Sequence, residues 1–459
     1  MSSRSKKRAY VETYGCQMNI SDGELMEGIL EGRGYRIVDA PEDADVVLVN
    51  TCAIRDHAEK RVLGRVAQLN GLRRERPGMV LGVTGCMAQR MGEALLEQAP
   101  YVDLVMGPDG YRGLPEALAR LDADVPIVER PRGKKRGPQL AVLQLDMDEN
   151  YQGLEQRRTE GPTAWVPIQR GCDHRCTYCI VPYVRGGEKN RSAVEILDEV
   201  RALAEGGVSE VTLLGQTVNS YVWEAVSFPQ LLRRVAQVDG IRRVRYTSPH
   251  PNDVTPELVA VMAEEPAVCE HLHLPAQAGN DRTLKRMLRR YTVESLLQKI
   301  DMVRAAMPDI ALSTDIIVAF PGETDEEFRD TLDLMRGVRF DDAFTYKYSP
   351  RDGTPATRLP EGDFIDPDVA QTRLEELINV SRAIQAEINE SEVGRVEEVL
   401  IEGAGRDEGQ VRGRTGRNKV VVFDGSAERI GEYTEVVLER TTGATFSGAE
   451  VDAKVAVSM

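Results

Sequence analysis

Short apolar runs alternate with amphipathic stretches along the first part of the chain. The runs are rich in Val, Leu and Met, and the stretches between them carry apolar residues at helical spacing. Strands are predicted at residues 10–14, 45–50, 79–84 and 102–106, and helices at 22–31 and 58–74. Strands that alternate with helices form parallel sheets, so residues 7–123 are predicted to fold as an open parallel α/β domain.

A stretch interrupted by proline and glycine follows, and the alternation then returns. Residues 124–157 are predicted to be a linker. Residues 158–390 are predicted to contain strands at 164–169, 210–214, 243–247, 270–274, 311–318 and 342–348, with helices between them. Six strand–helix repeats are typical of a partial (β/α)6 barrel of the TIM type, in which functional groups lie at the carboxyl ends of the strands.

The last section changes character. A long helix is predicted at 369–390, and short alternating runs punctuated by glycine follow at 394–401, 410–414, 418–423 and 434–438. This pattern predicts a small antiparallel β-barrel over 391–455. Such barrels bind single-stranded or looped nucleic acid through strand faces and loops, and a purely structural role fits the pattern equally. The chain is therefore predicted to be a multi-domain α/β protein.

The charge balance restricts how the chain can bind nucleic acid. It carries 58 Lys and Arg against 74 Asp and Glu, a net charge of −16. This excludes a protein that coats nucleic acid through bulk electrostatics, so any RNA contact requires a local basic patch. One candidate patch is 130–136 and the other is Arg412, Arg414, Arg417 and Lys419. A solvated surface explains either patch equally well.

Three cysteines lie close together at the start of the predicted partial barrel: Cys172, Cys176 and Cys179. Three thiolates can hold a 4Fe–4S cluster but leave one iron without a protein ligand. This spacing resembles that of the radical S-adenosylmethionine (SAM) enzymes, in which the open iron binds SAM. The alternative is a structural zinc site, which needs a fourth ligand such as His174.

Three further cysteines each follow a predicted strand directly: Cys16, Cys52 and Cys86. The carboxyl ends of parallel strands share one edge, so these thiols are predicted to meet and to hold a second cluster. The alternative is that cysteine, a small hydrophobe, ends buried strands by chance. Cys269 is predicted to be a buried thiol, and His271 and His273 are predicted to be hydrogen-bonded core imidazoles.

Seven cysteines and a polar, basic start without a secretory apolar region predict a reducing, cytoplasmic location. No apolar run approaches the length of a membrane span. Four polar residues that follow predicted barrel strands are candidates for binding SAM: Gln216, Asn219, Gln277 and Glu323. Their side chains suit the amino-acid and ribose groups, but such residues are also common in turns.

Four motifs resemble those of the radical SAM methylthiotransferase family, in the MiaB branch that modifies tRNA. They are Tyr14-Gly-Cys-Gln-Met-Asn19, Asn50-Thr-Cys-Ala-Ile-Arg55, Cys176-Thr-Tyr-Cys-Ile-Val-Pro-Tyr-Val-Arg185 and Gly413-Arg-Thr-Gly-Arg-Asn-Lys419. The likeness covers nearly the whole chain: a methylthiotransferase N-terminal domain, a radical SAM core and a TRAM domain. The RimO branch, which modifies a ribosomal protein, typically has Leu-Gly-Cys-Pro-Lys-Asn at the first motif.

The resemblance implies methylthiolation of C2 of N6-isopentenyladenosine, 3′ of the tRNA anticodon, with two SAM and an auxiliary 4Fe–4S cluster as sulfur source. It implies these partners: the tRNA anticodon loop, an electron donor of flavodoxin or ferredoxin type and an iron–sulfur carrier, with the chain acting as a monomer. The alternatives are RimO-type methylthiolation of a ribosomal protein aspartate, and an iron–sulfur protein that binds RNA or senses redox state without turnover.

Overall fold

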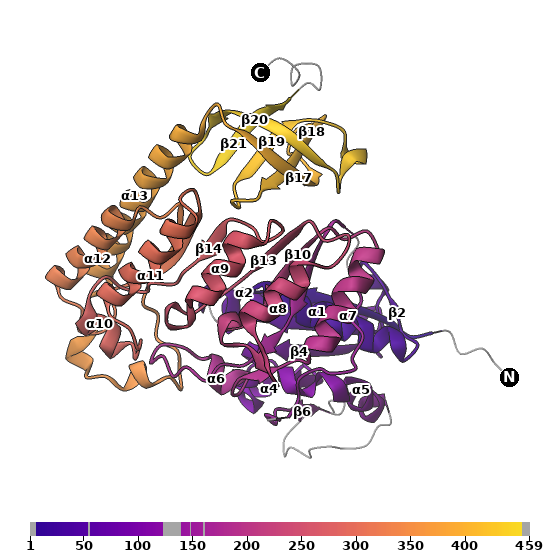
Figure 1. The fold of residues 1–459 in the computed structure, drawn as a ribbon. Helices are drawn as coiled ribbons and strands as arrows, with labels where there is room; N and C mark the ends of the chain where they lie inside the picture. The colour runs from indigo at the N-terminus through magenta and orange to yellow at the C-terminus, as the bar shows by residue number, and fades with distance from the viewer. Residues whose placement is uncertain (1–5, 54–55, 123–138, 147, 159–160, 452–459) are drawn as a thin grey trace. The chain divides into compact units, whose positions relative to one another are not determined.

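The computed structural model describes residues 6–53, 56–122, 139–146, 148–158 and 161–451. The chain divides into two compact units. Figure 1 shows the fold, coloured from the N-terminus to the C-terminus. Unit 1 comprises the chain up to residue 158 together with Gln169–His174 and Cys179–Arg191. Unit 2 comprises 161–168, Arg175–Tyr178 and residues 192–451.

A parallel six-stranded sheet with the order β2-β1-β3-β4-β5-β6 forms the centre of unit 1. Its strands are β1 (Arg8–Thr13), β2 (Arg36–Ile37), β3 (Val46–Thr51), β4 (Val80–Gly85), β5 (Leu104–Met106) and β6 (Leu140–Val142). All six residues of β3 are buried, as expected of a central strand that is covered on both faces.

Helices cover both faces of this sheet. They are α1 (Gln17–Gly32), α2 (Asp56–Asn70), α3 (Cys86–Met91), α4 (Glu93–Gln98) and α5 (Leu114–Asp122). Val46 and Leu48 of β3 share a core with α1 and α5, whereas Val47 and Val49 share the opposite core with α2, α3 and α4. Successive side chains of a strand point to opposite faces, so the sheet separates two cores. The predicted parallel α/β domain is confirmed.

The linker prediction for 124–157 needs a correction. Leu140–Val142 forms β6, which pairs in parallel with β5, and Glu149 and Tyr151 are buried in the same unit. The run is too short to stand out in the sequence, and it becomes a strand because the edge of β5 supplies hydrogen-bond partners. Residues 123–138, which include the basic patch at 130–136, lie outside the described residues.

The part of unit 1 that follows residue 168 is short. It contains β8 (Gln169–Arg170), which pairs antiparallel with β9 (Lys189–Asn190), and the helix α6 (Val181–Val184). Pro182 stands in the first turn of α6, where the missing N–H is not needed.

Unit 2 begins with parallel strands and helices in alternation. The strands are β7 (Thr163–Pro167), β10 (Glu210–Leu214), β13 (Arg243–Tyr246), β14 (His271–His273), β15 (Ala311–Val318) and β16 (Asp342–Lys347). The helices are α7 (Ala193–Glu205), α8 (Phe228–Ala236), α9 (Pro256–Glu264), α10 (Asp281–Arg286), α11 (Val293–Ala306) and α12 (Asp325–Val338). A small hairpin joins β11 (Val222–Trp223) to β12 (Val226–Ser227).

The six parallel strands form two three-stranded sheets, β13-β10-β7 and β14-β15-β16. The parallel bridge between Val244 and Val268 continues the hydrogen bonding beyond β13 toward the second sheet. One hydrophobic core contains residues of both sheets and of the surrounding helices. This is the predicted partial barrel of six strand–helix repeats.

The long helix α13 (Pro367–Glu392) leads into a closed five-stranded barrel (Figure 1). Its strands are β17 (Val396–Ala404), β18 (Gln410–Thr415), β19 (Val420–Asp424), β20 (Tyr433–Thr441) and β21 (Thr445–Glu450). The predicted small barrel is confirmed, with one correction to its topology. β21 is an additional strand, and it pairs in parallel with β19 to close the barrel.

Among the described residues, no helix has both the length and the apolar character needed to cross a membrane.

Candidate cysteine centres

Cys16, Cys52 and Cys86 lie at the carboxyl ends of three neighbouring strands of unit 1. Cys16 follows β1 and caps α1, Cys52 follows β3, and Cys86 follows β4 as the first residue of α3. The strand order β1-β3-β4 places all three ends on one edge of the sheet. The structure therefore places these three cysteines at neighbouring strand ends on one edge of the sheet.

Two glycines allow the backbone to approach closely at this edge. Gly15 has φ +146°, and a Cβ placed on it would lie 2.7 Å from Cys52 Cβ. Gly85 has φ +93°, and a Cβ there would lie 2.4 Å from the carbonyl oxygen of Thr51. Larger residues would therefore push the cysteine-bearing loops apart.

Two of the three thiols are buried, and that of Cys16 is partly buried. Cys52 and Cys86 are each 7% exposed. A hydrogen bond from Cys52 lowers the pKa of Cys16 to about 6, whereas burial raises the pKa of Cys86. The thiolate is the form of cysteine that binds metals, and a low pKa favours it. The donor set of three clustered sulfurs suits an iron–sulfur cluster with one open iron.

Arg185, directly after α6, reaches the same edge of unit 1. Its Nε donates a hydrogen bond to Cys86 Sγ over 3.1 Å, and its Nη2 donates to the carboxylate of Asp22. Both side chains of this ion pair are 2% exposed. Arg185 ends one of the four family motifs, but no role was predicted for it from the sequence. The available signal was a basic residue that ends the apolar run from Ile180 to Val184.

The second set of cysteines lies in a loop that contributes to both units. Cys172 and Cys179 belong to unit 1, and Cys176 belongs to unit 2. In unit 1, the backbone N–H of Cys172 donates to the carbonyl of Gly186. In unit 2, Arg289 Nη1 donates to Cys176 Sγ over 3.5 Å.

The residues predicted to bind SAM lie in unit 2 after β10, β14 and β15. Within the described part of the chain, the Oε1 atoms of Gln216, Gln277 and Glu323 are buried without a hydrogen-bond partner. Glu323 Oε2 accepts hydrogen bonds from Ala319 N and from Arg373 Nη1, and burial raises the pKa of Glu323 to about 7.

Asn219 differs from these three residues. Its Nδ2 donates to the carbonyl of His250 over 2.9 Å, and its Oδ1 accepts from the His250 N–H over 2.7 Å. This paired contact ties the loop after β10 to the segment after β13. The structure thus gives Asn219 a clear structural role.

Cys269, His271 and His273 lie within unit 2. Cys269 is buried, and burial raises its pKa to about 11. Both imidazoles contact Ser313 Oγ at 3.0 Å, and His273 Nε2 lies 3.3 Å from an oxygen of Asp315. The predictions of a buried thiol and of hydrogen-bonded core histidines are therefore confirmed.

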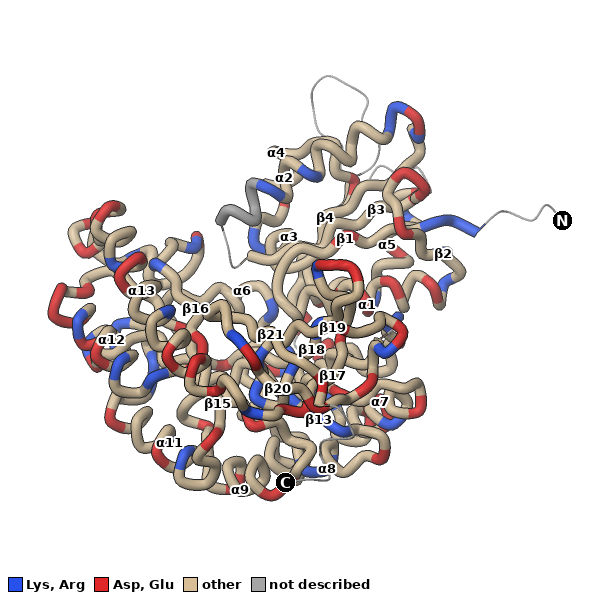
Figure 2. Tube along the Cα trace, turned by 90° about the horizontal axis from the view of Figure 1, so that it is seen from above, with Lys and Arg blue, Asp and Glu red and all other residues tan. Residues whose placement is uncertain are grey.

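The predicted basic patch near the C-terminus is wrong for two of its four residues. Arg417 and Lys419 are 8% and 9% exposed. Arg417 pairs with Glu392 and Glu397, and Lys419 Nζ pairs with Asp341 over 2.8 Å. The ion pairs of Arg417 with Glu392 and of Lys419 with Asp341 attach the barrel to the rest of unit 2. Acidic and basic residues both occur along the strands of the barrel (Figure 2). Arg412 is exposed.

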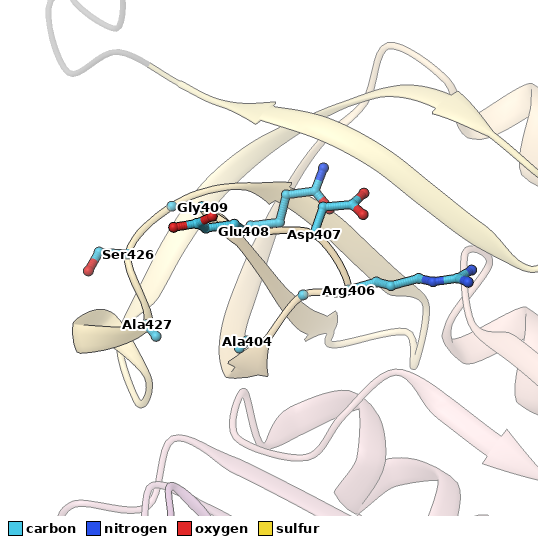
Figure 3. Close-up of a pocket in the computed structure, with 10 residues that line it drawn as sticks. Ala404, Arg406, Asp407, Glu408, Gly409, Ser426 and Ala427 are labelled. Carbon is cyan, nitrogen blue, oxygen red and sulfur yellow. The ribbon is translucent and has the colours of Figure 1, made fainter.

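A hollow at one end of the C-terminal barrel includes none of the predicted site residues. It is formed by the loop between β17 and β18 and by the residues after β19 (Figure 3). Arg406, Asp407 and Glu408 are the charged residues that line it. Its mixed charge gives no basis for assigning it an anionic ligand.

Comparison with known proteins identifies three regions. Residues 8–107 match Uncharacterized protein family UPF0004, residues 166–335 match the Radical SAM superfamily, and residues 390–449 match the TRAM domain. The tRNA-2-methylthio-N(6)-dimethylallyladenosine synthase of Thermoanaerobacter sp. (strain X514) is 44% identical over 453 residues, which cover 96% of this chain and 92% of that protein. The chain belongs to the tRNA-2-methylthio-N(6)-dimethylallyladenosine synthase family. It is therefore a radical SAM methylthiotransferase.

A second member of this synthase family, from Carboxydothermus hydrogenoformans, is 42% identical over 440 residues, 94% of this chain and 96% of that protein. Among solved structures, the radical SAM methyltransferase TsrM from Kitasatospora setae has a TM-score of 0.58 and 15% identity. That similarity covers 83% of this chain and 89% of TsrM and concerns the fold alone. Membership of the Radical SAM superfamily implies a 4Fe–4S cluster and SAM as cofactors.

Proposed function

We propose that this chain transfers a methylthio group to C2 of N6-isopentenyladenosine 3′ of a tRNA anticodon. The observation that carries the proposal is the presence of two three-cysteine sets in one chain. One set meets at the sheet edge of unit 1, and the other lies within the radical SAM segment. The relatives that match over nearly the whole chain carry a name that specifies this tRNA nucleoside.

Each cysteine set would hold one 4Fe–4S cluster. Cys172, Cys176 and Cys179 would hold the cluster that binds SAM, and Cys16, Cys52 and Cys86 would hold the auxiliary cluster. When bound, the auxiliary cluster would supply the sulfur that a first SAM methylates, and the other cluster would supply reductive cleavage of a second SAM. The Radical SAM match over 166–335 favours an iron–sulfur cluster over the zinc alternative at Cys172, Cys176 and Cys179.

Radical chemistry suits this substrate because an aromatic C2–H bond is too strong and too weakly acidic for side-chain acid–base catalysis. A cofactor must supply the reactive species, and the protein binds, orients and shields it. The burial of Cys52 and Cys86 supports the shielding role, because it keeps water from the sulfurs at this edge.

Gln216, Gln277 and Glu323 are proposed to accept hydrogen bonds from SAM. Their unpaired Oε1 atoms are acceptors, and SAM offers an ammonium group and two ribose hydroxyls as donors. A buried acceptor without a partner costs free energy, which a bound donor would recover. Asn219 would act indirectly, because it positions the segment that includes His250.

Other parts of the proposal concern partners. The exposed Arg412 of the C-terminal barrel is a candidate contact for RNA phosphate, whereas Arg417 and Lys419 are excluded by their buried ion pairs. Four further features remain predictions: an electron donor of flavodoxin or ferredoxin type, an iron–sulfur carrier, a monomeric state and a cytoplasmic location.

The proposal is tested by incubating reconstituted protein with SAM, a reductant and either isopentenylated tRNA or ribosomal protein. Mass spectrometry of the digested products should find the added methylthio group on the tRNA nucleoside alone. Modification of a ribosomal protein aspartate would favour the RimO-type alternative. Absence of both products, with iron present, would favour an iron–sulfur protein without turnover.

A further inference from the structure

Arg185 brings a buried positive charge to the edge where Cys16, Cys52 and Cys86 meet. Its side chain is 2% exposed and contacts Cys86 Sγ through Nε and Asp22 through Nη2. A buried ion pair has no solvent to replace a lost partner, so these contacts hold the guanidinium in one orientation.

One nitrogen of this guanidinium has no acceptor within the described residues. Among the described residues, Arg185 Nη1 is buried and has no hydrogen-bond partner. Arginine donates through all three of its nitrogens, and buried donors in folded proteins are almost always paired. The spare donor therefore indicates an acceptor that the polypeptide itself does not provide.

Arg289 offers a direct comparison. It is also buried and also donates to a cysteine sulfur, that of Cys176. Its Nε donates to Tyr291 Oη over 3.0 Å, and its Nη2 donates to the carbonyl of Pro275 over 3.1 Å. All three nitrogens of Arg289 are paired within the protein, whereas Arg185 keeps one donor for another group.

We propose that Arg185 is a positioning residue of the Cys16/Cys52/Cys86 centre and donates through Nη1 to an anionic sulfur of the group bound there. This inference rests on the auxiliary cluster of the proposed function. Through Nε, Arg185 donates to Cys86 Sγ over 3.1 Å and so fixes the position of this sulfur. Hydrogen bonds and positive charge at cluster sulfurs stabilise the reduced state, so Arg185 raises the reduction potential of this centre.

The test isolates the auxiliary centre in the full chain. A parent protein with Cys172→Ala, Cys176→Ala and Cys179→Ala is reconstituted with iron and sulfide. Its iron content and midpoint potential are compared with those of the same protein carrying Arg185→Met or Arg185→Lys. The Met variant removes both charge and donors. Lys keeps the charge but lacks the planar fork that serves several acceptors.

We expect Arg185→Met to shift the midpoint potential to a more negative value and to lower the iron retained after gel filtration. Arg185→Lys should recover part of the potential. Because Arg185→Met leaves Asp22 as an unpaired buried charge, it is also combined with Asp22→Asn, which should restore folding but not the potential. Arg73 provides the control, since it pairs with Asp103, which lies at the amino end of β5 and so away from the carboxyl ends that carry the cysteines. Arg73→Met should leave iron and potential unchanged.

A midpoint potential and iron content that are unchanged in Arg185→Met would overturn the inference. A parent protein that binds no iron would refute the auxiliary cluster and this inference with it. Neither iron content nor midpoint potential depends on tRNA. The role of Arg185 can therefore be refuted independently of the proposed reaction.

Discussion

Arg245 is predicted to be a main anchor of the C-terminal barrel within unit 2. It lies on β13 and is 8% exposed. Its Nε and Nη2 donate to Glu210 over 2.9 and 3.3 Å, and it also donates to the carbonyls of Thr415 and Gly416 over 2.7 and 3.1 Å. Arg245 therefore joins a buried carboxylate of the partial barrel to the turn that follows β18.

The substitution Arg245→Met would leave Glu210, which is 3% exposed, without its nearest cation. Removing one partner of a buried ion pair costs about 3–5 kcal/mol. Arg243 Nη1 remains 4.0 Å from Glu210, so we expect the lower end of this range, about 3 kcal/mol. The double variant Arg245→Met with Glu210→Gln leaves no unpaired buried charge and should recover at least half of the loss.

Urea unfolding followed by tryptophan fluorescence provides the assay, because both tryptophans of the chain, Trp165 and Trp223, lie in unit 2. Arg242→Met is the matched control. Arg242 is half-exposed and pairs with the exposed Glu398, so its loss should cost less than about 1 kcal/mol. The reasoning is refuted if Arg245→Met costs no more than this control.

Three further predictions follow from the cysteine centres and from Glu323. Cys16→Ala should keep reductive SAM cleavage, lose methylthiolation and lower bound iron to about half; iron analysis checks this, with Cys269→Ala as the control that keeps full iron. Cys176→Ala should abolish 5′-deoxyadenosine formation, measured by chromatography, and normal yields would contradict the assignment. Burial raises the pKa of Glu323 from 4.5 to about 7, so the folded state binds this proton more tightly than the unfolded state. The resulting stabilisation is complete below pH 4.5 and is lost as pH rises through about 7. Relative to wild type, Glu323→Gln should therefore gain about 3 kcal/mol between these pH values in urea unfolding, and a constant difference would refute the shift.

The cysteine edge of unit 1 was predictable because it depends on local patterns. Each of three apolar runs ends at a cysteine, and parallel strands necessarily share their carboxyl edge. The role of Arg185 was not predictable in this way. Its partners Asp22 and Cys86 lie 163 and 99 residues away in the chain, and only the folded structure shows that Nη1 has no partner.

The errors have physical causes of the same kind. Arg417 and Lys419 belong to a basic run in the sequence, but they pair with acids of α13 and β17 and with Asp341, directly before β16. The strands β6 and β21 are short or weakly apolar. Pairing with β5 stabilises β6, and pairing with β19 and β20 stabilises β21. The sequence also does not show that the side-chain amide of Asn219 hydrogen-bonds the backbone of His250, 31 residues away.

The central claim is that the Cys16/Cys52/Cys86 centre provides the transferred sulfur. It is tested most directly by reconstituting the protein with isotopically labelled sulfide, removing free sulfide and allowing a single turnover with SAM, reductant and isopentenylated tRNA. The account predicts labelled sulfur in the methylthio group of the modified nucleoside. A modified nucleoside that carries only unlabelled sulfur, or the same labelled product from Cys16→Ala, would contradict it.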